Sequence, residues 1–317
     1  MDLYRISGRK LNALENEPFL LEKDIQSVVE ENLEALFNLT FVSTEFAIGE
    51  FRLDTLCFEE ETNAFVIIEY KLKRNYSVID QGYSYLSAML NNKAEFILEF
   101  NEKSDRTLKR NDVDWASSRV IFISPAFNNF QKNSVNFKDI PFELWQIQRS
   151  KGGLIGLEQH QASSRESIET ISGREQKSLI SKVSSEVRVV TEEDHIAKAS
   201  DNCQKIWVEF RDRLANFSGT HFFSTKSYVG MKKGTKNLCV IGFRKNSLNI
   251  EVVRGTIRPS GKRSKEFFSF DDPKKVAKDK TWKWKSGDTG VVYVLKVDAV
   301  NDLDYVMYLI NQKYEKI

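Results

Sequence analysis

Three charged residues in two short segments could together hold a metal ion and a water molecule. Asp54 lies in the segment Arg52–Leu56, and Glu69 and Lys71 end the segment Phe65–Lys71. Hard divalent cations prefer oxygen ligands such as carboxylates. Because charges at the end of a buried strand are costly to desolvate, they are usually paired or bind a metal. The alternative is that Glu69 and Lys71 lie at a solvated strand end and Asp54 in an ordinary turn.

The two segments have the pattern of adjacent strands. Residues 65–68 are four apolar residues in a row, which is typical of a strand that is covered on both faces. Residues two apart in a strand share a face, so Glu69 and Lys71 should point the same way. Residues 51–58 also read as a strand, and the connection to the next strand is short and polar, as a hairpin requires. We therefore expect Asp54 to lie alongside Glu69 and Lys71.

Further elements surround this motif in an α/β order. We expect a helix over residues 21–37, strands over 41–48, 51–58 and 64–72, a helix from about 78 to about 98, and strands over 119–124 and 142–147. Ser77 is expected to cap the second helix, with Asp80 in the capping-box position. Helices before, between and after strands predict a sheet that is flanked by helices.

The length of 317 residues allows two domains. Residues 163–185 contain eight serines and few aromatic residues, which indicates a linker or a loosely packed extension. We therefore predict one domain over residues 1–155, a linker or extension over 156–190, and a smaller α+β domain over 191–317. The second domain should open with a helix after Thr191, continue with strands over 238–243, 248–253 and 291–296, and close with a helix over 303–314.

The net charge of +2 conceals an uneven distribution of charge. Residues 201–317 hold 23 basic and 13 acidic residues, whereas residues 1–200 hold 24 basic and 32 acidic ones. Aromatic rings interleaved with lysines suit phosphate contact and base stacking. The alternative is a solvated basic face with the two tryptophans half in the core. The nucleic-acid-binding candidates are Lys262, Arg263, Lys265, Trp282, Lys283, Trp284 and Lys285.

Several classes of site find no support in the sequence. The three cysteines and three histidines are scattered, so a disulfide framework, a zinc site and a Ser-His-Asp triad are not expected. Residues 232–236 lack the spacing of a phosphate-binding loop. Residues 1–23 contain no apolar segment of signal-peptide length, and no run approaches the roughly 18 apolar residues of a membrane span. We expect a cytoplasmic protein without a membrane partner.

Along the chain, Glu22 in the first helix is followed by Asp54, by Glu69-Tyr70-Lys71, and by Gln81-x-x-x-Tyr85 in the second helix. This order resembles that of the PD-(D/E)XK nuclease superfamily, and within it the NucS (EndoMS) type of mismatch endonuclease. Leu53 stands where the superfamily often has proline. The chain also resembles uncharacterised bacterial proteins that join such a domain to a small C-terminal domain and are sometimes labelled "predicted transport protein", a label without physical basis in this sequence. The resemblance covers about residues 1–150 and 195–317.

This resemblance implies a restriction-endonuclease-like core, a mixed central sheet flanked by helices, that cleaves DNA with Mg²⁺ or Mn²⁺. Asp54, Glu69 and the Tyr70 carbonyl would hold the metal ion, and Glu22 would bind it directly or through water, with Glu31 as the reserve candidate. Lys71 would orient the attacking water and offset phosphate charge. Gln81 and Tyr85 would hold Lys71, the phosphate or the water; alternatively, they form a helix flank that packs on the sheet.

Three functions follow from these expectations. The first is a Mg²⁺-dependent DNA endonuclease, in which the basic C-terminal domain or a homodimer partner anchors the substrate. The second is a nucleic-acid-binding module that keeps the nuclease scaffold without turnover. The third is a protein-interaction scaffold in which the charged trio is structural.

Overall fold

The computed structural model describes residues 3–72, 77–160, 164, 166, 176–265, 267–283 and 287–317, and the chain forms two compact units. The first unit spans Met1–Val189 and the second Val190–Ile317. Part of the stretch that the sequence suggested as a linker belongs to the first unit. Within it, α6 (Gln176–Ser184) is a helix, and Ile180, Val183 and Val187 are buried in the core of that unit.

The first unit contains a six-stranded mixed sheet with the order β3-β4-β5-β6-β7-β8. β5 pairs in parallel with β6, and β6 with β7, whereas the other neighbours are antiparallel. The strands are β3 (Thr40–Ile48), β4 (Phe51–Glu59), β5 (Ala64–Tyr70), β6 (Arg119–Ser124), β7 (Phe142–Ser150) and β8 (Leu154–Gln159). All seven residues of β5 are buried, as the run of apolar residues predicts for a central strand.

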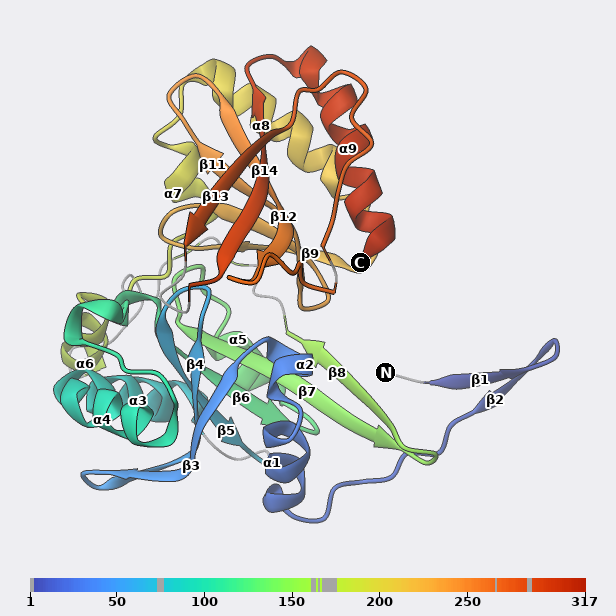
Figure 1. The fold of residues 1–317 in the computed structure, drawn as a ribbon. Coiled ribbons are helices and arrows are strands. Elements are labelled where there is room, and N and C mark those ends of the chain that lie inside the picture. Colours follow the sequence, from blue (N-terminus) through green and yellow to red (C-terminus); the bar gives the residue numbers. More distant parts are fainter. Residues whose placement is uncertain are drawn as a thin grey trace. The chain divides into compact units, whose positions relative to one another are not determined.

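Helices cover both faces of this sheet (Figure 1). α1 (Glu22–Glu30) and α2 (Leu33–Phe37) pack on the face that carries Val66, Ile68 and Tyr70 of β5. α3 (Val78–Asn91), α4 (Lys93–Lys103) and α6 pack on the face that carries Phe65 and Ile67. α5 (Asn129–Ser134) and the short 3₁₀ helices η1 (Arg110–Asp112) and η2 (Trp115–Ser117) complete the helical elements described in this unit. The predicted mixed sheet flanked by helices is confirmed.

Two helices that the sequence predicted as continuous are each divided in two. The break between α1 and α2 falls at Asn32, and the break between α3 and α4 falls at Asn92. Both asparagines have non-helical ψ values of 20° and 36°. Each donates its side-chain amide to the carbonyl four residues earlier, Asn32 Nδ2 to Val28 O at 2.8 Å and Asn92 Nδ2 to Ala88 O at 2.7 Å. Short polar side chains compete with the backbone in this way and favour helix ends.

An antiparallel hairpin of β1 (Tyr4–Ser7) and β2 (Lys10–Ala13) precedes α1. Its register places Tyr4 opposite Ala13 and Ile6 opposite Leu11, so one face of the ribbon is apolar. All eight strand residues are exposed, and Figure 1 shows the hairpin projecting away from the sheet of its unit. The connecting segment is attached to the end of β7, where Glu17 N donates to Arg149 O at 2.9 Å.

The second unit has an antiparallel six-stranded sheet with the order β13-β14-β12-β11-β10-β9. Its strands are β9 (Thr220–Ser224), β10 (Val229–Lys233), β11 (Lys236–Phe243), β12 (Leu248–Ile257), β13 (Lys278–Lys283) and β14 (Thr289–Val297). Its helices are α7 (Glu192–Ile196), α8 (Asp201–Leu214), η4 (Val300–Asp302) and α9 (Leu303–Lys316). Side chains of α8 and α9 form one core with one face of the sheet, which confirms the predicted α+β class. Thr191 caps α7 as predicted, but the single helix that the apolar spacing from Ile196 to Leu214 predicts is divided before α8, which Ser200 caps.

No helix within the part of the chain that the structure describes is long and apolar enough to cross a membrane.

A largely buried ion triad ties three strands of the first sheet together. Arg119 of β6 reaches across β5 to Glu59 of β4 with two hydrogen bonds of 2.9 and 3.0 Å, and its Nε donates to Glu143 of β7 at 2.6 Å. Glu143 also accepts from the Trp145 indole at 2.8 Å. A buried ion pair is costly to break, because removing one partner leaves the other charged and desolvated.

We predict that Arg119→Met destabilises the first unit by about 3–5 kcal/mol, because Glu59 and Glu143 would be left without their buried counter-ion. Urea unfolding followed by hydrogen exchange of peptides from residues 1–189 measures this change. Lys151→Met is the matched control, because Lys151 pairs with Glu15 at a fully solvated surface. A destabilisation in Arg119→Met no larger than in this control would show that the triad does not hold the strands together.

Candidate active site

The pairing of β4 with β5 ends where the charged residues begin. Thr55 is opposite Ile68, and one residue further along, the Asp54 carboxylate accepts the Tyr70 backbone N–H at 3.0 Å. The carboxylate thus takes the place of a backbone acceptor at the end of the ladder. Asp54 shares a strand face with Leu56, which belongs to the core under α3.

Glu69 and Lys71 form an ion pair on that same side of the sheet. Lys71 Nζ donates to Glu69 Oε1 at 2.6 Å, and the two side chains are only 12% and 4% exposed. The Lys71 backbone N–H donates to Ile123 O at 2.9 Å, so the residue continues the pairing with β6 beyond the last residue of β5. The expected common orientation of Glu69 and Lys71 is therefore present in the structure.

α3 brings two polar side chains to this ion pair. Gln81 Nε2 donates to Glu69 Oε1 at 2.7 Å and lies 2.7 Å from the Tyr85 hydroxyl, one helical turn further along. Ser77 caps the helix by accepting the Asp80 N–H at 3.4 Å, as the sequence predicts. Gln81 and Tyr85 therefore face the sheet at the position of Glu69. Burial and the charge of Glu69 raise the pKa of Tyr85, so its hydroxyl keeps its proton.

The two oxygens of Glu69 differ in their surroundings. Oε1 accepts from both Lys71 and Gln81, whereas Oε2 is buried and has no hydrogen-bond partner among the residues that the structure describes. A buried carboxylate oxygen without a donor is costly, so such an atom indicates a missing cation or donor. Asp54 lies close enough for the negative charges of the two carboxylates to interact. The donor set is therefore one of hard oxygens, which suits Mg²⁺ or Mn²⁺.

Burial is the main reason why the pKa of Asp54 is raised, to about 7 from its ordinary value of 3.8. The negative charge of Glu69 raises the pKa further, while the Tyr70 N–H and the charge of Lys71 oppose the shift. Two carboxylates that share one site disfavour each other's ionisation, and a bound cation removes that penalty.

Glu22 lies at the edge of this group. Its Oε1 accepts the Leu72 N–H at 2.8 Å, one residue after Lys71, but the side chain is exposed. Glu31 lies after the end of α1 and is also exposed. No group of three or more His, Cys, Asp or Glu side chains able to hold a metal occurs in the described ranges. The structure therefore brings Asp54 and Glu69 together, and Glu45, whose negative charge also acts on Asp54, does not complete a metal-holding group of three with them among the described residues.

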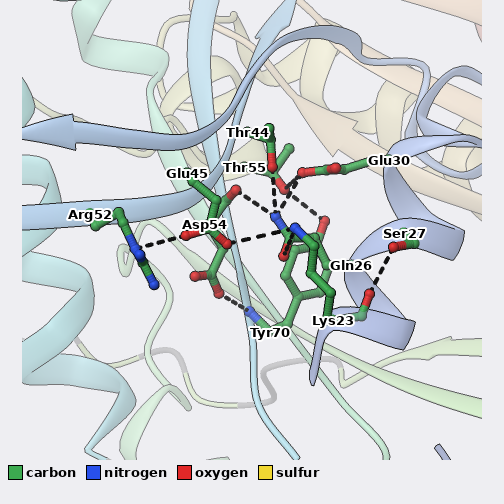
Figure 2. A network of polar contacts seen from close by, with 10 residues as sticks. All are labelled: Lys23, Gln26, Ser27, Glu30, Thr44, Glu45, Arg52, Asp54, Thr55 and Tyr70. Atoms are coloured by element: carbon green, nitrogen blue, oxygen red, sulfur yellow. Dashed lines mark hydrogen bonds and ion pairs between the residues drawn. The ribbon is translucent and has the colours of Figure 1, made fainter. Parts of the chain in front are cut away.

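A second layer of polar residues, which no motif in the sequence had indicated, lies on the opposite face of the sheet (Figure 2). Gln26 of α1 is 3% exposed, and its Nε2 donates to the Asp54 carbonyl at 2.9 Å. Glu30, one turn later, accepts from Thr55 Oγ1 at 2.6 Å. The signal was a glutamine directly after Ile25 on the buried side of an amphipathic helix, a position where an apolar residue is usual.

The nucleic-acid-binding candidates lie in the second unit. Lys262, Arg263, Lys265 and Lys283 are exposed. Trp282 is half-buried against the sheet, since a Cβ placed on Gly290 of the neighbouring strand would lie 2.3 Å from its ring. This packing agrees with the alternative in which the tryptophan belongs partly to the core. Trp284 and Lys285 lie outside the described residues.

Comparison with known proteins identifies one relative along nearly the whole chain. No family model matches the sequence. An uncharacterised protein from Haemophilus influenzae is 39% identical over 318 residues, and the alignment covers 98% of this chain and 99% of that protein.

Three solved structures are similar to parts of the chain. The EndoMS–dsDNA complex covers 39% of this chain at 18% identity with a TM-score of 0.26, and a repair endonuclease from Pyrococcus abyssi covers 38% at 15% identity with a TM-score of 0.22. SfsA of Pyrococcus furiosus in complex with Ca²⁺ covers 52% at 13% identity with a TM-score of 0.27. The matches span 45%, 44% and 77% of those chains, which is less than half of the first two. TM-scores of this size leave the function of this chain open.

The raised pKa of Asp54 predicts a pH dependence of stability in metal-free buffer. Between about pH 4 and pH 7 the folded state keeps a proton that the unfolded chain releases, so the protein becomes less stable as the pH rises through this range. Each unit of pKa difference is worth about 1.4 kcal/mol. Asp54→Asn abolishes this titration, so the melting temperature of the variant relative to the parent should be higher at about pH 7.5 than at about pH 4.5. A difference that does not change with pH would contradict the raised pKa.

Proposed function

We propose that this chain, which belongs to the same family as the uncharacterised Haemophilus influenzae protein, is a metal-dependent nuclease that hydrolyses phosphodiester bonds in DNA. The observation that carries this proposal is the meeting of two carboxylates with one ammonium group on the buried face of a sheet. Asp54 and Glu69 lie together, Lys71 Nζ is 2.6 Å from Glu69, and the second Glu69 oxygen has no hydrogen-bond partner among the described residues. A purely structural ion pair would not need the second carboxylate.

Asp54 and Glu69 would hold a Mg²⁺ or Mn²⁺ ion. The Tyr70 carbonyl is a suitable third ligand, because its N–H faces Asp54 and the two backbone groups of one strand residue face the same neighbour. The Glu22 carboxylate accepts the backbone N–H of Leu72, two residues after Tyr70, and would bind the ion through a water molecule. Such an ion, when bound, supplies a nucleophile from water at neutral pH and stabilises charge on the phosphate.

The side chains of the protein would then position and neutralise the reacting groups. Lys71 would exchange its bond to Glu69 for contacts to the attacking water and to a phosphate oxygen, where an ammonium group in a site shielded from solvent is most effective. Gln81 would keep Glu69 in place through its amide. The Tyr85 hydroxyl, which keeps its proton, would donate to the phosphate and would not act as a base.

The second unit would supply the attraction for DNA. Residues 1–189 carry more acidic than basic residues, 29 against 23, so the unit that holds the candidate site repels phosphate overall. Lys262, Arg263 and Lys265 are exposed and lie in one segment between β12 and β13. Because the Trp282 ring is half-buried, little of it is available for base stacking. We therefore favour contacts between these basic side chains and the phosphate backbone.

The described residues include no group of three His, Cys, Asp or Glu side chains able to hold a metal ion, which favours one second candidate, a module that binds nucleic acid without cleaving it. The two functions differ in one outcome. A nuclease releases product with Mg²⁺ or Mn²⁺, whereas the module binds DNA and leaves it intact.

We predict that Lys71→Met lowers Mg²⁺-dependent cleavage of plasmid and single-stranded DNA by at least about 100-fold, a typical effect when a charge-stabilising donor is removed. Initial rates at saturating DNA measure this effect. The matched control is Lys151→Met, which removes an equally paired but solvated lysine. Cleavage by Lys71→Met at the rate of the parent protein would show that Lys71 has no part in the reaction.

We predict that replacing Lys262, Arg263 and Lys265 together by alanine weakens DNA binding and its salt dependence. The slope of log K against log salt should decrease by about 0.9 for each phosphate that these three side chains neutralise in the parent protein. Fluorescence anisotropy at several salt concentrations provides the slope. Alanine at three exposed lysines of the first unit, Lys103, Lys109 and Lys138, is the control of equal charge. If both triple variants keep the slope of the parent, DNA is bound elsewhere.

A further inference from the structure

Gln26 connects the helix layer of α1 to the strand that carries Asp54. Its amide Nε2 lies 2.9 Å from each of three acceptors, the Asp54 carbonyl, Thr44 Oγ1 and Glu30 Oε1. Its Oε1 accepts from Lys23 Nζ at 3.2 Å. Figure 2 shows these groups converging on the glutamine from α1, β3 and β4. Every polar atom of this buried side chain is therefore used.

The Asp54 carbonyl depends on Gln26 because the strand ladder is interrupted beside it. Thr44 pairs with Thr55 and Phe46 with Leu53, but the pair between them, Glu45 and Asp54, is missing from the ladder. Glu45 has a left-handed backbone with φ of 53°, which turns its peptide groups away from regular pairing. Gln26 therefore supplies a donor to this half-buried carbonyl at a position where β3 and β4 do not pair.

The neighbouring contacts attach the same helix to both strands of the site. Glu30 Oε1 accepts from Gln26 Nε2 and from Thr55 Oγ1. Thr55 Oγ1 lies 3.1 Å from the Tyr70 hydroxyl, and because its proton is given to Glu30, the tyrosine is the donor. Tyr70 is also the residue whose N–H binds the Asp54 carboxylate. Asp54 is thus held at its carbonyl through Gln26 and at its carboxylate through Tyr70.

We propose that Gln26 is a positioning residue that fixes Asp54 for binding of a divalent cation. This inference rests on the proposed function and deepens it, since Gln26 lies on the opposite side of the sheet from Lys71 and touches no reacting group. Ligands of a metal site must be held within about 0.5 Å of their working geometry, and residues that support a ligand set its affinity. The Gln26 side chain of α1 gives this support to the backbone of Asp54.

The test compares Gln26→Met with Val29→Ala. Methionine keeps the length and volume of the side chain and removes its donors. Val29, three residues later on α1, is fully buried in the core between the helix and the sheet, and its truncation weakens the packing of α1 without removing a contact to Asp54. Both variants should lower the melting temperature, so stability alone does not decide between a structural and a positioning role.

Two measurements on the full chain distinguish a positioning role of Gln26 from a structural one. The first is the Mg²⁺ concentration for half-maximal cleavage, which we expect to rise about 10- to 100-fold in Gln26→Met, the usual range for a residue that supports a metal ligand, and to stay at the parent value in Val29→Ala. The second needs no activity: in protein labelled with ¹⁵N-tyrosine, exchange of the Tyr70 amide should accelerate in Gln26→Met alone, and titration of its resonance with Mg²⁺ should show weaker binding.

Each result decides the proposal. If the parent cleaves DNA and Gln26→Met keeps the parent Mg²⁺ requirement and Tyr70 exchange rate, the positioning role is wrong and the nuclease function stands. If Val29→Ala changes both measurements as much as Gln26→Met, the effect is general loosening of α1 and the proposal is overturned. If the parent binds Mg²⁺ but does not cleave, and Gln26→Met weakens that binding, the positioning role stands and the nuclease function does not. If Mg²⁺ leaves the Tyr70 resonance unchanged in the parent, both proposals fall.

Discussion

The hydrogen bond from the Tyr70 backbone to the Asp54 carboxylate is the contact on which the candidate site depends. It forms where the pairing of β4 with β5 ends, so a backbone donor that would otherwise seek a strand partner is available to a side chain. The bond fixes the carboxylate at the end of the β4–β5 pairing, where the negative charge of Glu69 repels it. Lys71 is the cation that the structure places beside this pair of negative charges.

Asp54 and Glu69 are held from opposite sides of the sheet by two glutamines. Gln81 of α3 binds the Glu69 side chain on one face, and Gln26 of α1 binds the Asp54 backbone from the other. An uncharged amide can hold a carboxylate or a carbonyl without neutralising it, so the negative charge remains available to a cation. This arrangement requires both helix layers to be in place before the site has its geometry. The fold and the candidate chemistry are therefore coupled through α1 and α3.

The strands and the residues at their ends were predictable because the signals are local. The apolar run before Glu69 and the two-residue periodicity place Glu69 and Lys71 together, and the hairpin spacing places Asp54 beside them.

The role of Gln26 was not predictable from the sequence. Its partner is the Asp54 carbonyl, which lies beside the irregular backbone at Glu45, and no residue pattern encodes that irregularity. The helix breaks at Asn32 and Asn92 were missed because the apolar periodicity continues through both positions. The packing of Trp282 on Gly290 depends on a strand pairing between residues that are adjacent only in the folded sheet.

The ion triad of Arg119 has a consequence for the alignment of the strands. Because the guanidinium spans β5 and binds carboxylates on β4 and β7, it opposes sliding of any one of these strands against the others. A slip of one residue would exchange the two faces of a strand and would turn Glu69 into the space that Ile68 or Tyr70 now fills. Arg119 is in register with Val66, near the other end of β5 and three residues before Glu69, which is about 10 Å at about 3.3 Å per residue. Substitutions at that distant end could therefore silence the site by misalignment while every residue around Asp54 remained unchanged.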